Sequence, residues 1–152
     1  MKITLVNILE AILFSNSSLI YWNCDHQDPK TGNWWLKIND NDVIGYWPGS
    51  LFNSLGDGAI KVEWGGEIFA PTSDRHTTTD MGSGHFAEEG IKKASYVKNI
   101  MIVDGTNALR EPQGLYSYAD NRNCYSVVPG NAGTSFGTHF FYGGPGQNVK
   151  CP

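Results

Sequence analysis

Charged side chains are scarce in this chain, and basic ones are scarcer than acidic ones. Only 17 % of the 152 residues are charged, and 11 Lys and Arg against 15 Asp and Glu give a net charge of −4. Nucleic acids and anionic membrane surfaces attract basic proteins, so the composition predicts no nucleic-acid partner. No stretch reaches the roughly 20 apolar residues that a membrane-spanning helix needs, so we also predict no membrane span.

Long helical patterns are missing too, and short β-type runs between turns take their place. Aromatic residues make up 12 % of the chain, which also contains 18 glycines and 7 prolines. Such runs, bounded by Gly, Pro, Asn and Asp, are typical of strands and turns. We predict an all-β fold, an antiparallel β-sandwich or partly open barrel, with one short helix over Pro48–Leu55. The predicted strands are Leu19–Asn23, Trp34–Ile38, Val43–Trp47, Ile60–Phe69, Ala94–Val103, Cys124–Val128 and Thr138–Tyr142, with weaker candidates at Met81–Phe86 and Leu115–Tyr118 and turns at Asp28–Asn33 and Asp104–Asn107.

Cysteine is rare, and its odd count leaves one residue over. The chain has three cysteines, Cys24, Cys124 and Cys151. Cys124 and Cys151 lie in a turn-rich region without metal-ligand spacing, and we interpret them as a disulfide that fixes the C-terminus. Closing that loop would contribute roughly 3–4 kcal/mol in the chain-entropy model. Cys24 is then either free or paired with a cysteine that this chain does not contain.

The first 18 residues stand apart from the rest. Met1, Lys2 and the apolar run after them are similar to the core of a short signal peptide, but Asn7 and Glu10 interrupt the run and no clean cleavage site follows. We predict that residues 1–18 are a weakly signal-like or misjoined segment and that residues 19–152 form one domain. The β-type, glycine-rich composition favours a secreted, extracellular protein.

Metal and nucleophile motifs are weak. His76, Asp80 and His85 lie within ten positions, but their spacing matches no standard zinc motif. Ser83 lies between two glycines, yet the spacing differs from that of a nucleophile elbow. We therefore predict no metal and no cofactor.

One carboxylate, Glu67, has an unusual setting. It lies in Ile60–Phe69, which is typical of a strand, directly after Gly65 and Gly66. Glycines inside a strand mark a bulge or a close approach of another backbone. Partial desolvation would raise the pKa of the Glu67 carboxyl toward the range useful for acid–base chemistry. The alternative is a solvent-facing Glu on a half-buried strand, and the segment taken alone favours that alternative.

Aromatic side chains supply a second candidate feature. Trp34, Trp35, Tyr46, Trp47 and Trp64 could line a groove that binds a peptide or a sugar. Neighbouring strand residues point to opposite faces, so one of each adjacent pair meets a ligand, a partner or solvent. The alternative, that large rings simply cover sheet edges, is equally open.

Several motifs, taken in order, resemble one family. The chain from about Leu19 to Pro152 is similar to the C-terminal half of the plant neprosin domain. The segments that carry the resemblance are Asp28–Leu36, Val43–Pro48, Trp64–Glu67, His76–Phe86, Lys93–Tyr96 and Tyr142–Gly146.

This resemblance implies a secreted glutamic endopeptidase that cleaves after proline and folds as an antiparallel β-sandwich. The family's second catalytic glutamate lies in a (Trp/Phe)-Gly-Gly-Glu motif, which matches Glu67 and reverses the preference for a merely solvent-facing Glu. Its C-terminal cysteine pair matches Cys124 and Cys151. Proline would be held in an aromatic or apolar slot, for which the candidates are Tyr46, Trp47 and Trp64.

The chain also departs from the family pattern. The family's first glutamate lies in a Glu-Ala-Gly-Trp segment, and the only Glu-Ala here, Glu10-Ala11, is followed by Ile-Leu. We therefore expect a truncated domain that is inactive as this chain and whose partner is a proline-containing peptide or protein. The alternative is a non-catalytic extracellular module that binds peptides or glycans.

Overall fold

The computed structural model confirms the predicted all-β fold class in the residues that it describes. These residues are 22–38, 42–53, 55, 59, 61–68, 78–130 and 135–152. Among them all strand pairings are antiparallel, and no helix has the length and apolar character to cross a bilayer. The elements are β1 (Trp22–Gln27), β2 (Trp34–Ile38), β3 (Asp42–Trp47), the 3₁₀ turns η1 (Gly49–Leu51) and η2 (Ala87–Glu89), β4 (Ser95–Val97), β5 (Ile102–Val103), β6 (Leu109–Arg110), β7 (Ser126–Gly130) and β8 (His139–Gly143).

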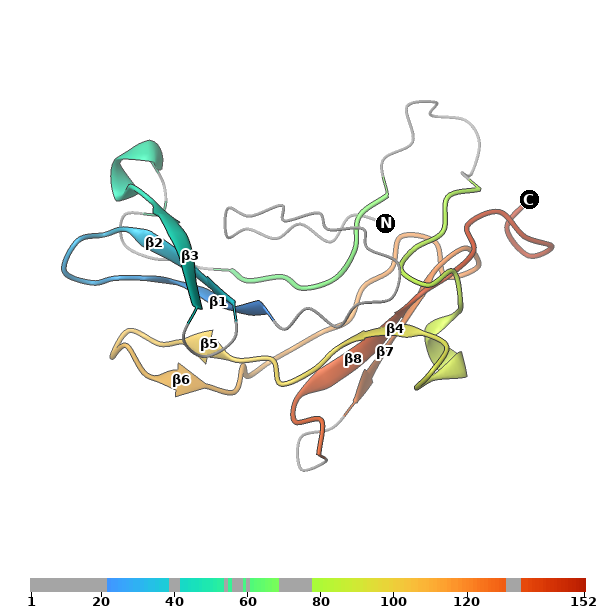
Figure 1. Ribbon diagram of the computed structural model, residues 1–152. Coiled ribbons are helices and arrows are strands. Elements are labelled where there is room, and N and C mark those ends of the chain that lie inside the picture. The colour runs from blue at the N-terminus through green and yellow to red at the C-terminus, as the bar shows by residue number, and fades with distance from the viewer. Residues whose placement is uncertain are drawn as a thin grey trace. The chain divides into compact units, whose positions relative to one another are not determined.

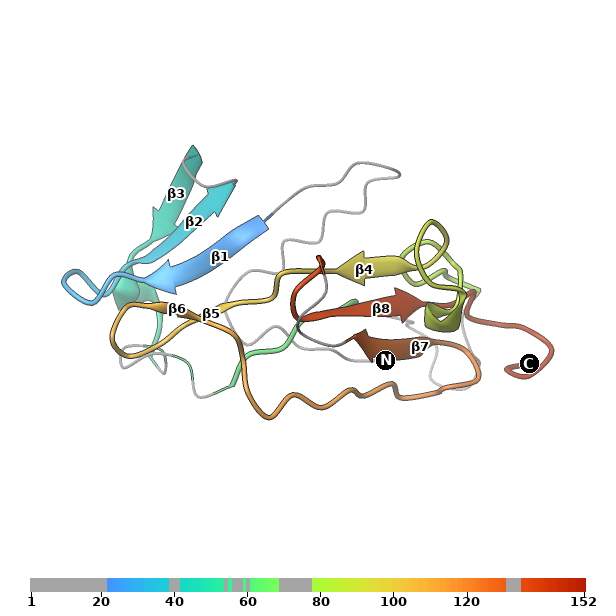
Figure 2. The same ribbon diagram turned by 90° about the horizontal axis from the view of Figure 1, so that it is seen from below.

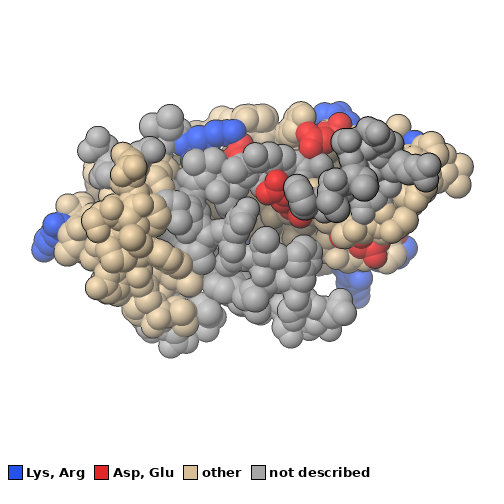
Figure 3. Space-filling view, turned by 90° about the horizontal axis from the view of Figure 1, so that it is seen from above, with Lys and Arg blue, Asp and Glu red and all other residues tan. Residues whose placement is uncertain are grey.

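The chain divides into two compact units, which we describe separately. The N-terminal unit contains the described part of Val6–Val62 together with Met101–Glu111, and the C-terminal unit contains the described part of Glu63–Ile100 together with Pro112–Pro152. The predicted boundary at residue 18 lies outside the described residues. On the face drawn in Figure 3, the charged side chains of the described residues are scattered and form no continuous basic patch.

The N-terminal unit holds an antiparallel meander in the order β1-β2-β3 (Figure 1). In the turn from β1 to β2, the Asp28 N–H donates to the Asn33 carbonyl at 2.9 Å, and Gly32 adopts a φ of 71°. Glycine reaches that conformation without steric cost. The predicted turn and the two strands after it are confirmed. The first predicted strand, Leu19–Asn23, overlaps β1 only from Trp22, because residues 19–21 lie outside the described ranges.

The predicted helix over Pro48–Leu55 is wrong. Only Gly49–Leu51 forms a 3₁₀ turn, and Phe52 directly after it is extended, with φ −122° and ψ 118°. Leu51 is 63 % exposed, so it does not contribute to the buried apolar face that the pattern implied. A single turn fixes several backbone angles for few hydrogen bonds and extends only where tertiary packing supports it.

The predicted strand Ala94–Val103 is divided into β4 and β5. Asn99 between them has a φ of 52°, a left-handed conformation that Asn tolerates better than most residues. The N–H groups of Asn99 and Ile100 donate to the carbonyls of Phe136 and Thr138 instead of continuing one ladder. As a result β4 belongs to the C-terminal unit and β5 to the N-terminal unit.

The turn between β5 and β6 confirms the turn predicted at Asp104–Asn107. The Asp104 carboxylate accepts hydrogen bonds from the Thr106 N–H and hydroxyl at 2.9 and 2.6 Å, and from the Arg110 Nε at 2.7 Å. The hydrogen bond from the Thr106 hydroxyl, followed by those from Arg110 and the Ala108 N–H, holds the pKa of Asp104 well below its usual value.

This lowered pKa predicts a pH-dependent contribution to stability. An unfolded Asp titrates near pH ~3.9, so the interaction stabilises the fold fully above that pH and is lost as the pH falls through the lower folded pKa. We expect Asp104→Asn to lower the melting temperature at neutral pH, with a difference from the wild-type chain that narrows below about pH 4. Thermal unfolding followed by circular dichroism at several pH values measures this difference. A difference that stays constant with pH would contradict the assignment.

The C-terminal unit is built on a three-stranded antiparallel sheet in which β8 lies between β4 and β7 (Figure 2). The predicted strand at Thr138–Tyr142 is thus confirmed as β8, whereas the strand predicted at Cys124–Val128 begins later, at Ser126. Cys124 and Cys151 form the predicted disulfide, with a Cα–Cα distance of 5.3 Å. A buried cluster surrounds this disulfide and consists of Met81, Cys124, Tyr125 and Cys151, with Ile68 and Tyr142 packed against it.

Two weaker strand predictions are wrong. Met81 makes only an isolated bridge to Gly144, and the chain turns at once, with the Gly84 N–H donating to the Met81 carbonyl at 3.1 Å. Residues 115–118 form no strand, and their side chains are exposed. Positive φ angles at Gly82 and Gly84 explain the first case, because neither residue can continue a ladder in that conformation.

Candidate functional site

The segment that carries Glu67 is not a strand. The predicted strand Ile60–Phe69 is wrong for residues 61–68, which are irregular, and its two end residues lie outside the described ranges. Gly65 has a φ of 153°, which is outside the β region and is reached mainly by glycine. The backbone therefore departs from strand geometry two residues before Glu67.

Gly66 is closely approached by the side chains of Met81 and Tyr142, whereas the sequence predicted a bulge or the approach of another backbone. A Cβ atom on Gly66 would overlap the Met81 Sδ atom and lie 3.3 Å from the Tyr142 Cε2 atom. Ile68 packs against the buried cluster around the disulfide. The residues on both sides of Glu67 are therefore fixed on the core of the C-terminal unit, and the backbone that presents the carboxylate is held in place.

The Glu67 side chain itself is exposed. It makes no hydrogen bond or ion pair with any residue that the structure describes. The desolvation expected from the sequence is therefore wrong for this chain, because Ile68 turns into the core while the carboxylate turns to solvent. Such a group can accept a hydrogen bond from a ligand that approaches from outside. Glu63, four residues earlier, is half-buried and already engaged with another residue.

The three aromatic candidates fall in different units. Trp64 is half-buried in the same segment as Glu67. Tyr46 and Trp47 lie in β3 of the N-terminal unit, where the Tyr46 ring centroid is 4.7 Å from that of Trp35. Trp64 and Glu67 lie near each other because they are three positions apart in one segment. A proline-binding slot that also includes Tyr46 and Trp47 stays a prediction.

Tyr142 is a candidate that the sequence did not single out. Its Cε2 atom lies 3.3 and 3.5 Å from the positions that Cβ atoms on Gly66 and Gly82 would occupy. Burial raises the pKa of its hydroxyl, so the group remains a hydrogen-bond donor well above neutral pH. In the sequence, Tyr142 is marked only by the two glycines that follow it. Its proximity to Gly66 in the Glu67 segment becomes visible only in the structure.

The metal candidates do not gather in the described part of the chain. No group of three His, Cys, Asp or Glu side chains there could hold a metal ion, and His76 lies outside it. The His85 Nδ1 atom is instead 3.0 Å from a carboxylate oxygen of Glu89, which also pairs with Lys93 at 3.3 Å. These contacts form a surface ion cluster around η2.

Comparison with known families agrees with the motifs around this site. Residues 13–145 match the family model described as Neprosin. The match covers well over half of the chain and includes the Glu67 segment, β3 and the aromatic candidates. It begins inside the N-terminal segment 1–18 and ends within the C-terminal turn that follows β8. The chain therefore belongs to the neprosin family.

Proposed function

We propose that this chain is the substrate-binding part of a secreted glutamic peptidase that cleaves after proline, and that Glu67 is one of its two catalytic carboxylates. The observation that carries the proposal is the presentation of Glu67. Its carboxylate is exposed and unpaired among the described residues, while Gly66 and Ile68 beside it are fixed on the core. The family match and the extracellular setting that a disulfide favours support the same proposal.

The reaction would be the attack of a water molecule on the carbonyl carbon of the proline residue, which breaks the bond from that carbon to the nitrogen of the next amino acid. One glutamate, as carboxylate, takes a proton from the water, and the other, protonated, donates to the carbonyl oxygen or to the leaving amine. Two neighbouring carboxyl groups push their pKa values apart. At one pH, therefore, one of the two can be ionised while the other is protonated. The two titrations belong to the pair, so either role suits Glu67.

We propose further that these 152 residues bind a proline-containing peptide without hydrolysing it. The sequence has no Glu-Ala-Gly-Trp segment, and no second carboxylate is paired with Glu67 among the described residues. The same observation favours the second candidate function, a non-catalytic module that binds peptides or glycans elsewhere on its surface.

Binding of a labelled peptide with a single proline, followed by fluorescence anisotropy at acidic and neutral pH, separates the two functions. We expect saturable binding that weakens about tenfold in Glu67→Lys, because a hydrogen bond to a charged group contributes about 1.5–3 kcal/mol. Glu63→Gln in the same segment is the control and should leave the affinity unchanged. Two results would support the second candidate instead. One is equal affinity for the peptide and for a version with alanine in place of proline, and the other is unchanged affinity in Glu67→Lys. Product detected by mass spectrometry that disappears in Glu67→Gln would contradict the proposed inactivity of this chain alone.

A further inference from the structure

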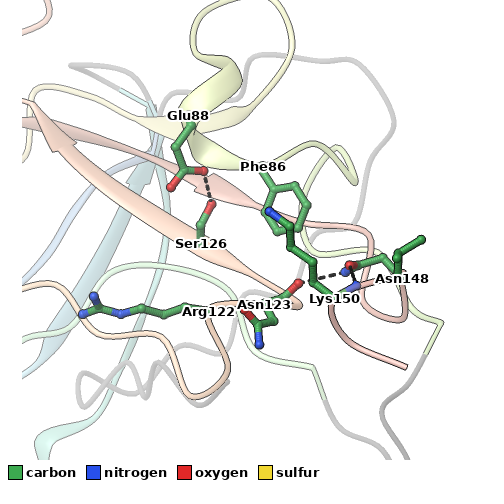
Figure 4. Close-up of a pocket in the computed structure, with 8 residues that line it drawn as sticks. Phe86, Glu88, Arg122, Asn123, Ser126, Asn148 and Lys150 are labelled. Atoms are coloured by element: carbon green, nitrogen blue, oxygen red, sulfur yellow. Dashed lines mark hydrogen bonds between the residues drawn. The ribbon is translucent and has the colours of Figure 1, made fainter.

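We propose that a pocket of the C-terminal unit binds the carboxylate-bearing sugar unit of an acidic glycan. The pocket has a volume of about 540 Å³ and is drawn in Figure 4. Its described lining residues all lie outside the Glu67 segment. The pocket is lined by an aromatic ring and several polar or charged side chains, among them Phe86, Glu88, Arg122, Asn123, Ser126 and Lys150.

The walls of this pocket are held rigidly. The disulfide joins Cys124, which follows Asn123, to Cys151, which follows Lys150. Asn148 adds a second connection, because its Nδ2 atom donates to the Asn123 carbonyl at 2.8 Å and its Oδ1 atom accepts from the Lys150 N–H at 2.9 Å. The backbones that carry Asn123 and Lys150 are therefore fixed before a ligand arrives, which reduces the entropy that binding costs.

A buried hydroxyl orients the one carboxylate in the pocket. Ser126 is 7 % exposed, and its Oγ atom accepts from the Ala87 N–H at 2.8 Å and donates to the Glu88 Oε2 atom at 2.7 Å. The other oxygen of Glu88 makes no hydrogen bond within the described part of the chain. It is therefore an acceptor with fixed direction and no partner of its own.

Two further polar groups of the pocket also lack partners among the described residues. They are the side-chain amide of Asn123 and the ammonium group of Lys150. Figure 4 shows the Lys150 side chain extending toward Phe86, whereas the guanidinium of Arg122 extends away from the other labelled residues. Lys150 is therefore the principal cation of the pocket, and Arg122 is secondary.

This set of groups matches the chemistry of a uronate. The ligand's carboxylate would pair with Lys150, two of its hydroxyls would donate to Glu88 and Asn123, and an apolar face of its ring would lie on Phe86. Because the net charge of the chain is −4, the protein as a whole does not attract anions. An anionic ligand would therefore be attracted locally, by the ammonium group of Lys150.

The test is a titration of the full chain with trigalacturonate, followed by amide shifts in nuclear magnetic resonance spectra. We expect saturable shifts centred on Asn123, Asn148 and Lys150, and no such shifts with the fully methyl-esterified trisaccharide. Lys150→Gln should weaken binding at least tenfold and Arg122→Gln by a smaller factor, because a charge-assisted hydrogen bond is lost in the first variant. Lys92→Gln removes an exposed cation outside the pocket and should change nothing.

Several outcomes would overturn the proposal. They are an absence of saturable shifts at millimolar ligand, equal binding of the methyl ester, shifts centred away from the pocket, and tighter binding of a peptide through its C-terminal carboxylate. Because the mutated side chains are exposed, each variant should keep the dispersed spectrum of the folded chain. Asn123→Ala, which leaves the charge unchanged, is a second variant that should weaken binding on its own.

Discussion

Replacing Gly144 with alanine is expected to destabilise the C-terminal unit by about 3 kcal/mol or more. A Cβ atom at this position would overlap the Cys124 carbonyl oxygen and lie 2.8 Å from the Tyr125 Cα atom. Both are backbone atoms beside the disulfide, so no side chain can turn aside to make room. The φ of 148° adds strain for any residue with a side chain. Against a typical total stability of about 5–15 kcal/mol, this is a large loss.

Urea denaturation followed by tryptophan fluorescence measures this effect as a lower transition midpoint with an unchanged slope. Gly105→Ala is the matched control, because a Cβ atom there would meet no atom within 4 Å and Gly105 has no positive φ. Its effect should stay within about 0.5 kcal/mol. Equal midpoints for the two variants would show that the contact between the Gly144 backbone and Cys124 is not as close as the structure has it.

Removing the Cys124–Cys151 disulfide is expected to cost about 3–4 kcal/mol. The two cysteines are 27 positions apart, so the bond closes a sizeable loop in the unfolded chain. In the folded chain both side chains are almost fully buried, and two serine hydroxyls in their place would lack the sulfur contacts of the cluster. The double variant Cys124→Ser/Cys151→Ser should therefore unfold at a clearly lower urea concentration.

The comparison is made in a Cys24→Ser background, so that no third thiol can exchange with the pair. Oxidised and reduced forms of that background separate the effect of the bond from that of the serines. A reduced form as stable as the oxidised form would contradict the expected contribution of the disulfide. The single variant Cys124→Ser should resemble the double variant, because either change removes the same bond.

The sequence predicted the parts of the fold whose signals are local. The turn at Asp28–Asn33 combines Pro, Gly and Asn at turn positions, and the strands on its C-terminal side, β2 and β3, were found as expected. The disulfide was also predicted, since Cys124 and Cys151 lie together in the turn-rich C-terminal region without metal-ligand spacing. Each of these features depends on residues close together in the chain or on a small choice of partners.

The wrong predictions have tertiary causes. The apolar residues of Pro48–Leu55 fit a helix, but Leu51 is exposed and the helical conformation ends after one turn. The run Ala94–Val103 fits one strand, but the Asn99 N–H pairs with Phe136, which no local pattern reveals. In the candidate site, the sequence predicted that Gly66 is closely approached, but not that side chains of Met81 and Tyr142 approach it, nor that Glu67 is exposed.

Each unit of the chain draws on stretches that interleave along the sequence. In the part of the chain that the structure describes, the polypeptide passes from one unit to the other at residues 62–63, 100–101 and 111–112. A cut at 62–63 would leave every described residue of the C-terminal unit on one fragment, residues 63–152, but would separate β5 and β6 from the rest of the N-terminal unit. Producing the C-terminal unit without any part of the other would require excising residues 101–111 from that fragment and joining Ile100 to Pro112 through a short designed connection.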